Sequence, residues 1–116
     1  MSLDVYMIRT GRYDDNNETF TKYVYDANIT HNLNTMADKA GLYDVVWRPD
    51  ENNIERAEQL IKPLEEGIAK LKADPEYFKG FNPENGWGTY EGLVDWLEKY
   101  LEACREWPKA KVEVSR

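Results

Sequence analysis

The sequence predicts an α+β fold in which three helices pack on one face of a small three-stranded sheet, antiparallel or mixed. Near the start, 3–9 has apolar residues on both of its alternating faces and forms a predicted hairpin with a second strand at 20–27, and 111–115 alternates as a final strand. Three segments between them place apolar residues at helical spacing. The order strand–strand–helix–helix–helix–strand is typical of a single layered domain, here 1–116.

The predicted hairpin has a long polar turn at 11–17. Asp14, Asn16 and Glu18 resemble the start of a calcium-binding loop, but Thr19 stands where such a loop needs glycine. We therefore exclude calcium there. Three tyrosines of the hairpin either line the uncovered face of the sheet, as a partner surface or dimer interface, or form ordinary cross-strand pairs; they are Tyr6, Tyr23 and Tyr25.

The first predicted helix starts at Asn28 or Thr30, because either side chain can accept a backbone hydrogen bond as an N-cap. Its apolar face consists of Ile29, Leu33, Met36, Ala37 and Ala40. Gly41 is well placed to end this helix in the left-handed conformation. The segment 42–47 is then a short apolar connection with another half-turn of helix, closed by Arg48-Pro49.

The second predicted helix follows capping residues at 50–53 and has an apolar face over 54–71. Pro63 lies inside this segment and removes one backbone hydrogen bond. We therefore expect a kink or a break near 60–62. A short helical turn at 75–81 follows.

The third predicted helix, 90–107, is the element around which the core is organised. One of its faces is apolar, and the opposite face carries Glu91, Asp95, Glu98, Glu102 and Glu106. Pro108 ends this helix. We expect the last strand to pair with the first, because that pairing closes the sheet around the longest helices.

Composition limits the classes of function. The chain has 116 residues, a net charge of −7 and one cysteine. The acidic charge disfavours binding to nucleic acid or to anionic membranes, since both need Lys and Arg. A single cysteine excludes an internal disulfide and favours a reducing compartment, and Cys104 itself is expected in the core. Because neither a signal peptide nor a transmembrane segment is recognised, we expect a cytoplasmic protein.

The sequence offers few groups for catalysis. His31 is the single histidine, which excludes two-histidine metal motifs and Cys/His zinc clusters, so we expect no metal and no cofactor. The serines, Ser2 and Ser115, lie near the termini, which disfavours a buried catalytic triad. An enzyme that uses His31 as general acid or base is the least favoured hypothesis, although the question stays open.

Three polar-aromatic clusters lie at element boundaries, where binding sites are usually mounted. They are Asn28, Thr30, His31 and Asn32; Trp47 and Arg48; and Trp87, Gly88 and Tyr90. Helix N-termini and Arg48 attract anions, and an indole stacks on planar rings. Each cluster also has a structural explanation: a cap with an exposed histidine, an ion pair of Arg48 with Asp44 or Glu51, and a turning loop whose Trp87 caps the core.

Two longer motifs stand out: 27–33 reads Ala-Asn-Ile-Thr-His-Asn-Leu, and 81–90 reads Phe-Asn-Pro-Glu-Asn-Gly-Trp-Gly-Thr-Tyr. Trp47-Arg48-Pro49 and the ending Val-Glu-Val-Ser at 112–115 accompany them. In this combination the chain resembles a family of small uncharacterised proteins encoded by bacteriophages and prophages, which has no assigned activity. The resemblance spans roughly 23–115 and implies a phage product made in the bacterial cytoplasm, without implying a mechanism.

Two hypotheses lead. The first is a binding protein for a small anionic, nucleotide-like ligand held where the three clusters meet, which in a phage would counter host defence. The alternative is a protein–protein interaction module or inhibitor that acts on a host protein through the acidic helix face or the tyrosines of the sheet. Homodimerisation through the sheet also stays open.

Overall fold

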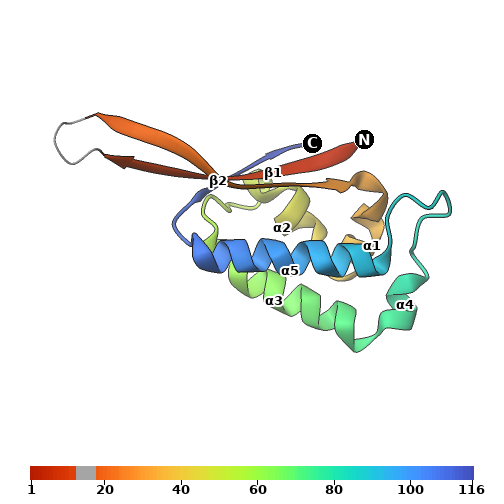
Figure 1. The fold of residues 1–116 in the computed structure, drawn as a ribbon. Coiled ribbons are helices and arrows are strands. Elements are labelled where there is room, and N and C mark those ends of the chain that lie inside the picture. The colour runs from red at the N-terminus through yellow and green to blue at the C-terminus, as the bar shows by residue number, and fades with distance from the viewer. Residues whose placement is uncertain (13–17) are drawn as a thin grey trace.

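The computed structural model describes residues 1–12 and 18–116 and has the α+β architecture that the sequence predicts (Figure 1). In chain order its elements are β1 (Ser2–Arg12), β2 (Thr19–Thr30), the 3₁₀ turn η1 (His31–Leu33), α1 (Asn34–Lys39), α2 (Tyr43–Trp47), the 3₁₀ turn η2 (Pro49–Glu51), α3 (Glu58–Ala73), α4 (Pro75–Lys79), α5 (Tyr90–Glu106) and β3 (Lys111–Ser115). The second and third predicted helices correspond to α3 and α5, and the first is divided into shorter pieces.

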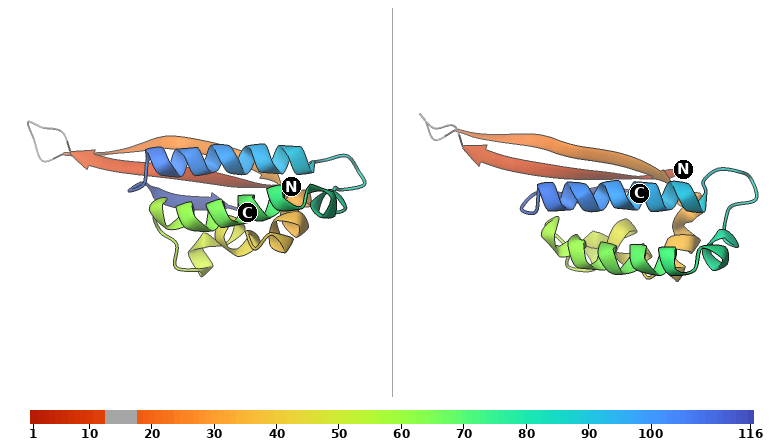
Figure 2. Two further views of the ribbon diagram at one scale, coloured as in Figure 1. Left: turned by 90° about the horizontal axis from the view of Figure 1, so that it is seen from below. Right: turned by 60° about the horizontal axis from the view of Figure 1, so that its bottom comes forward.

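The strands form one antiparallel sheet in the order β2-β1-β3, so the last strand pairs with the first as predicted. The helices lie on one face of this sheet, with α5 running along it and α3 packed beside α5 (Figure 1, Figure 2). Leu3, Val5 and Met7 of β1 are fully buried. Because alternate residues of a strand face opposite sides, this row points into the core, together with Ile29 of β2 and Val112 of β3.

A β-bulge separates the tyrosines of the hairpin, because β2 has one residue more than β1 at this point. The pairs on either side of it are Met7–Tyr25 and Ile8–Tyr23. The bulge places Tyr25 on the helical face, where its ring stacks on Tyr100 with centroids 5.9 Å apart. Tyr6 and Tyr23 remain in edge-to-face contact at 5.8 Å. The prediction that all three tyrosines line the uncovered face is therefore wrong for Tyr25.

Beyond Ile8 the hairpin has no third strand, and it extends past the end of α5 (Figure 1). Within this extension the Phe20 ring lies over Gly11, where an added Cβ would come within 2.5 Å of the ring. The Cα radius of gyration is 15.5 Å, whereas a compact domain of this length is expected at about 13 Å. The extended hairpin accounts for the difference.

The first four residues of the calcium loop excluded above, 14–17, lie outside the described residues, and from Thr19 onward its chain is part of β2. Among 1–12 and 18–116, no group of three or more His, Cys, Asp or Glu side chains is arranged to hold a metal ion. Within the same residues, no helix combines the length and the apolar character needed to span a bilayer.

The first predicted helix is replaced by the end of a strand and two short helices. β2 continues to Thr30, because Ile29 is buried as part of the strand. Thr30 then caps η1, with its hydroxyl oxygen accepting a hydrogen bond from the Asn32 N–H at 3.2 Å. Gly41 has φ 76° and follows α1, in agreement with its predicted role. The half-turn predicted at 42–47 is α2.

α3 begins later than predicted and does not break at Pro63. It starts at Glu58 because the residues before it bond to the sheet: the Val112 N–H donates to the Glu55 carbonyl at 2.9 Å. Pro63 lies inside a continuous helix. The carbonyl that loses its donor belongs to Gln59, an exposed residue of the first turn, where water can replace the missing bond.

α5 has nearly the predicted bounds, and the Thr89 hydroxyl caps it by accepting from the Gly92 N–H at 3.0 Å. Cys104 is fully buried, and burial raises the pKa of its thiol to about 12, which makes it unreactive at neutral pH.

The carboxylates on the acidic face of α5 mostly form ion pairs. The ion pairs are Glu91–Lys79, Asp95–Lys99, Glu98–Lys72 and Glu102–Arg105.

Candidate functional site

A hydrogen bond joins two of the three predicted clusters. His31 begins η1 directly after β2, and Trp47 ends α2. The Trp47 indole Nε1–H donates to His31 Nδ1 at 2.9 Å. Because Nδ1 is the acceptor, the neutral imidazole carries its proton on Nε2, which is a donor. Trp47 is only 1% exposed, so it orients His31 from within the core and its ring is not a stacking surface.

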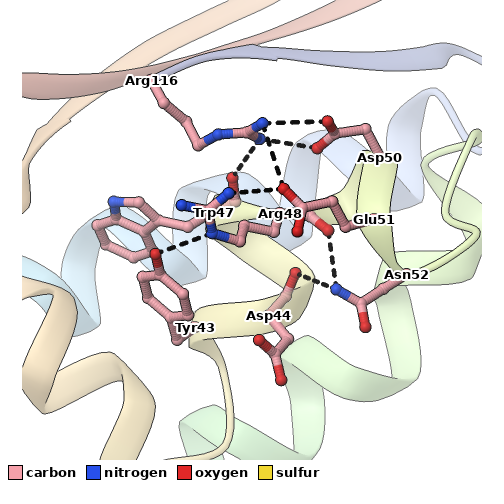
Figure 3. Close-up of polar contacts among 8 residues, drawn as sticks. All are labelled: Tyr43, Asp44, Trp47, Arg48, Asp50, Glu51, Asn52 and Arg116. Carbon is pink, nitrogen blue, oxygen red and sulfur yellow. Dashed lines mark hydrogen bonds and ion pairs between the residues drawn. The ribbon is translucent and has the colours of Figure 1, made fainter.

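An aromatic contact extends this cluster to Arg48. The rings of Tyr43 and Trp47, four residues apart on α2, stack with centroids 5.8 Å apart and planes at 15°. The Arg48 Nε–H donates to the Tyr43 hydroxyl at 3.1 Å (Figure 3). A continuous path therefore leads from His31 through Trp47 and Tyr43 to Arg48, and we call these four residues the η1–α2 cluster.

The Arg48 guanidinium is engaged by a carboxylate as well. Its Nη1 lies 2.6 Å from Glu51 Oε2, and the Arg48 side chain remains 38% exposed. The hydrogen bonds to Tyr43 and Glu51 stabilise the charged form and raise the pKa of Arg48. Of the two ion pairs that the sequence left open, the structure forms the one with Glu51 and not the one with Asp44.

A second arginine, Arg116, completes this charged group, and no sequence pattern points to it. Its guanidinium donates to both carboxylate oxygens of Asp50, at 2.7 and 3.1 Å, and to the Trp47 carbonyl at 3.0 Å (Figure 3). It also lies 3.6 Å from Glu51. The hydrogen bonds from Arg116 lower the pKa of Asp50. Arg116 thus ties the end of β3 to α2 and η2.

The third predicted cluster approaches the first through Gly88. This residue has φ 109°, and a Cβ added to it would lie 2.8 Å from Leu33 Cγ and 3.0 Å from Thr30 Cγ2. Both the backbone conformation and the close approach therefore favour glycine. The neighbouring Trp87 is 70% exposed, so the structural explanation in which it caps the core is wrong.

Two of the predicted residues have side chains committed elsewhere. Tyr90 is 8% exposed, and its hydroxyl donates to the Leu71 carbonyl at 2.7 Å. Asn28 faces away from the helices, and its amide donates to Ser2 Oγ at 2.8 Å and to Asp4 Oδ1 at 2.7 Å. The structure thus gathers part of the predicted set around η1: Thr30, His31, Asn32, Trp47 and Gly88.

Two grooves lie apart from these residues. One, of about 1210 Å³, lies between β3, the turn at 106–110 and the segment 53–56. The other, of about 660 Å³, lies between β2 and α5. Neither is lined by His31, Arg48 or Trp87, so neither is the shared pocket expected from the sequence. The lining of the second groove includes the predicted site residue Asn28, Trp96 at the border of the apolar face of α5, and part of the predicted acidic face.

The η1–α2 cluster offers an oriented histidine and an arginine at one end of the sheet, and the groove beside β2 offers an uncovered strand. No protein-family model, curated protein or solved structure matches this chain.

Proposed function

We propose that the chain binds a small anionic ligand with a planar ring, of the nucleotide class, beside η1. The hydrogen bond from Trp47 to His31 carries the proposal, because it joins two clusters that lie 16 residues apart. The close approach of Gly88 to Thr30 adds the third cluster. In this proposal, binding groups from three separate segments contact one ligand.

Each side chain has its own role in this proposal. His31 Nε2–H donates to an oxygen of the anion, and little rotational freedom is lost on binding because Trp47 already holds the ring. Arg48 supplies the positive charge. Trp87, exposed beside Gly88, stacks on the planar ring of the ligand.

Arg48 can release the Glu51 carboxylate and bind the ligand instead, because Glu51 also lies close to Arg116. Glu51 Oε2 lies 2.6 Å from Arg48 and 3.6 Å from Arg116. When an anion binds Arg48, Glu51 therefore stays paired with Arg116. Ion pairs as exposed as this one contribute little to stability, so the exchange is not strongly opposed.

The resemblance to phage and prophage proteins supplies a setting for the proposal: a phage product in the bacterial cytoplasm that sequesters a host signal or defence nucleotide. This part rests on the motifs at 27–33 and 81–90. Sequestration requires binding without turnover, and a cluster of hydrogen-bond donors and aromatic rings around a single histidine suits that task.

Calorimetric titration with mono-, di- and cyclic nucleotides, and with inorganic phosphate, tests the proposal. We expect saturable binding of at least one nucleotide and weaker binding of phosphate, which cannot stack on Trp87. Arg48→Ala should weaken nucleotide binding on the order of tenfold. The matched control is Arg105→Ala, since Arg105, like Arg48, is an exposed arginine that pairs with carboxylates. Absence of binding at about 1 mM, or equal losses in both variants, would contradict the proposal.

An interaction module that acts through the acidic face of α5 receives less support. Four of its five carboxylates are paired with cations, so this face is closer to neutral than the sequence suggests. Only the part of this face that borders the uncovered edge of the sheet, Glu98, Glu102 and Glu106, is suited to a protein partner.

A further inference from the structure

The two edges of the sheet differ. β3 forms one edge, and the segment before α3 covers its start, where the Val112 N–H donates to the Glu55 carbonyl and the Ala57 N–H donates to the Ala110 carbonyl, both at 2.9 Å. β2 forms the other edge and, among the described residues, pairs only with β1. An uncovered edge strand presents the backbone N–H and C=O groups to which a further strand binds.

The outward-facing backbone groups of β2 follow from its pairing. The His31 N–H donates to the Met1 carbonyl at 3.2 Å and continues the ladder between β2 and β1. In an antiparallel pair, every second residue bonds to the neighbouring strand and the residues between them point away. Counting back from His31, the backbone groups of Asn28 and Asp26 point to the open edge.

The groove of about 660 Å³ runs along this open edge, and Figure 2 shows α5 beneath the hairpin that contains β2. Tyr25 and Ala27 of β2 and Trp96 and Ala103 of α5 form its apolar surface. Side chains of a strand alternate between its two faces. A strand added to β2 would therefore place every second side chain over this groove.

The charges around the groove are mainly negative. Its charged lining residues are Asp26, Glu98, Lys99, Glu102 and Glu106. Glu98 and Glu102 pair with cations, whereas Glu106, and Asp26 on the other face of β2, have no ion pair within the described part of the chain. Uncompensated carboxylates repel a second copy of this acidic chain and attract a basic segment.

We propose that the open edge of β2 binds an extended, basic segment of another protein as a fourth strand of the sheet. The backbone of that segment bonds to the outward-facing groups of Asp26 and Asn28, which provides affinity. Its Lys or Arg side chains lie over the groove, with their alkyl parts on Tyr25 and Trp96 and their charged ends near Glu106. The carboxylates therefore select a cationic sequence.

NMR titration with a short synthetic peptide of alternating lysine and valine tests this proposal. We expect the amide signals of Asp26 and Asn28 to shift and to become protected from hydrogen exchange, and the affinity to fall with added salt. A peptide of alternating glutamate and valine is the matched control and should bind on the order of tenfold more weakly. Equal binding of the two peptides, or signal changes that spare β2, would overturn the proposal.

Two pairs of variants separate the backbone contribution from the charge. Asn28→Pro removes an outward N–H and no bond to β1, and Asn28→Ala controls for the side-chain bonds to Ser2 and Asp4. We expect Asn28→Pro to abolish peptide binding and Asn28→Ala to retain it. Glu106→Lys should weaken binding on the order of tenfold, whereas Glu84→Lys, an equal charge change in an exposed loop, should not.

The proposal fails if the two members of either pair behave alike while circular dichroism shows that both are folded. It also fails if the free protein sediments as a dimer in which the Asp26 and Asn28 amides are protected, because a second copy would then occupy the edge. Peptide binding that survives in Arg48→Ala would separate this surface from the proposed nucleotide site.

Discussion

Tyr90 and Tyr100 are both buried on α5, but they differ in the partner of the hydroxyl. Tyr90 donates to the Leu71 carbonyl at 2.7 Å, whereas the buried Tyr100 hydroxyl has no hydrogen-bond partner within the described chain. We expect Tyr90→Phe to lower the free energy of unfolding by about 1–3 kcal/mol, because a buried carbonyl loses its donor. Tyr100→Phe should leave it unchanged or raise it. Urea denaturation measures both, and equal losses would show that the Tyr100 hydroxyl has a partner.

The Cys104 thiol makes stability depend on pH in the alkaline range. Burial raises its pKa to about 12, compared with about 8.5 for an exposed thiol. Above pH ~8.5 the unfolded chain therefore releases a proton that the folded chain retains, so stability falls as pH rises towards 12. The slope from this group is about 1.4 kcal/mol per pH unit.

Urea denaturation of the wild type and of Cys104→Ala at several pH values between neutral and alkaline measures this slope. We expect the stability of the variant to decline less steeply, because it lacks the thiol. Parallel declines would show that Cys104 titrates in the folded state as it does in the unfolded chain.

In α3, Gly67 shows how packing reverses an intrinsic helix preference. Alanine is normally better than glycine within a helix, but an added Cβ here would lie 2.3 Å from Leu42 Cγ in the core. We expect Gly67→Ala to lower the free energy of unfolding by about 1–3 kcal/mol. Leu42→Ala should be less harmful in the Gly67→Ala background than alone. Chemical denaturation of the four proteins in this cycle measures the coupling, and strictly additive effects would contradict it.

The types of the elements followed from periodicity, whereas some of their ends did not. α5 matched its predicted bounds because the apolar stripe, the Thr89 cap and Pro108 agree locally. β2 ran on to Thr30, because Ile29 fits both a helical stripe and an alternating strand. The start of α3 was displaced by the hydrogen bond from Val112 to Glu55, a partner no local pattern indicates.

Hydrogen exchange of the free protein should show which edge of the sheet is open. We expect slow exchange of the Ala27 N–H, which bonds to β1, and fast exchange of the N–H groups of Asp26 and Asn28. Val112 should exchange slowly although it lies on an edge strand, since it donates to Glu55. NMR measurement of individual amides tests the pattern, and slow exchange at Asp26 and Asn28 would mean that another group covers β2.

The residue types of the candidate site could be predicted from the sequence, but the contacts between those residues could not. His31, Trp47 and Arg48 stood out because binding sites are usually mounted at element boundaries, and the structure joins the first two by a hydrogen bond. Arg116 and the groove along β2 were not found. Arg116 meets Asp50 across 66 residues, and the groove depends on an uncovered edge that strand order alone creates.

The sequence alone predicts the α+β class, the pairing of the last strand with the first, the core helix and the buried Cys104. The class, the helix and the buried cysteine depend on short-range periodicity, which decides which face of each element avoids water, whereas the strand pairing follows from closing the sheet around the longest helices. The bulge that separates Tyr23 from Tyr25, the bond between His31 and Trp47, and the open edge of β2 required the folded chain. Each depends on contacts between distant residues or on one inserted residue, and neither leaves a repeating pattern in the sequence.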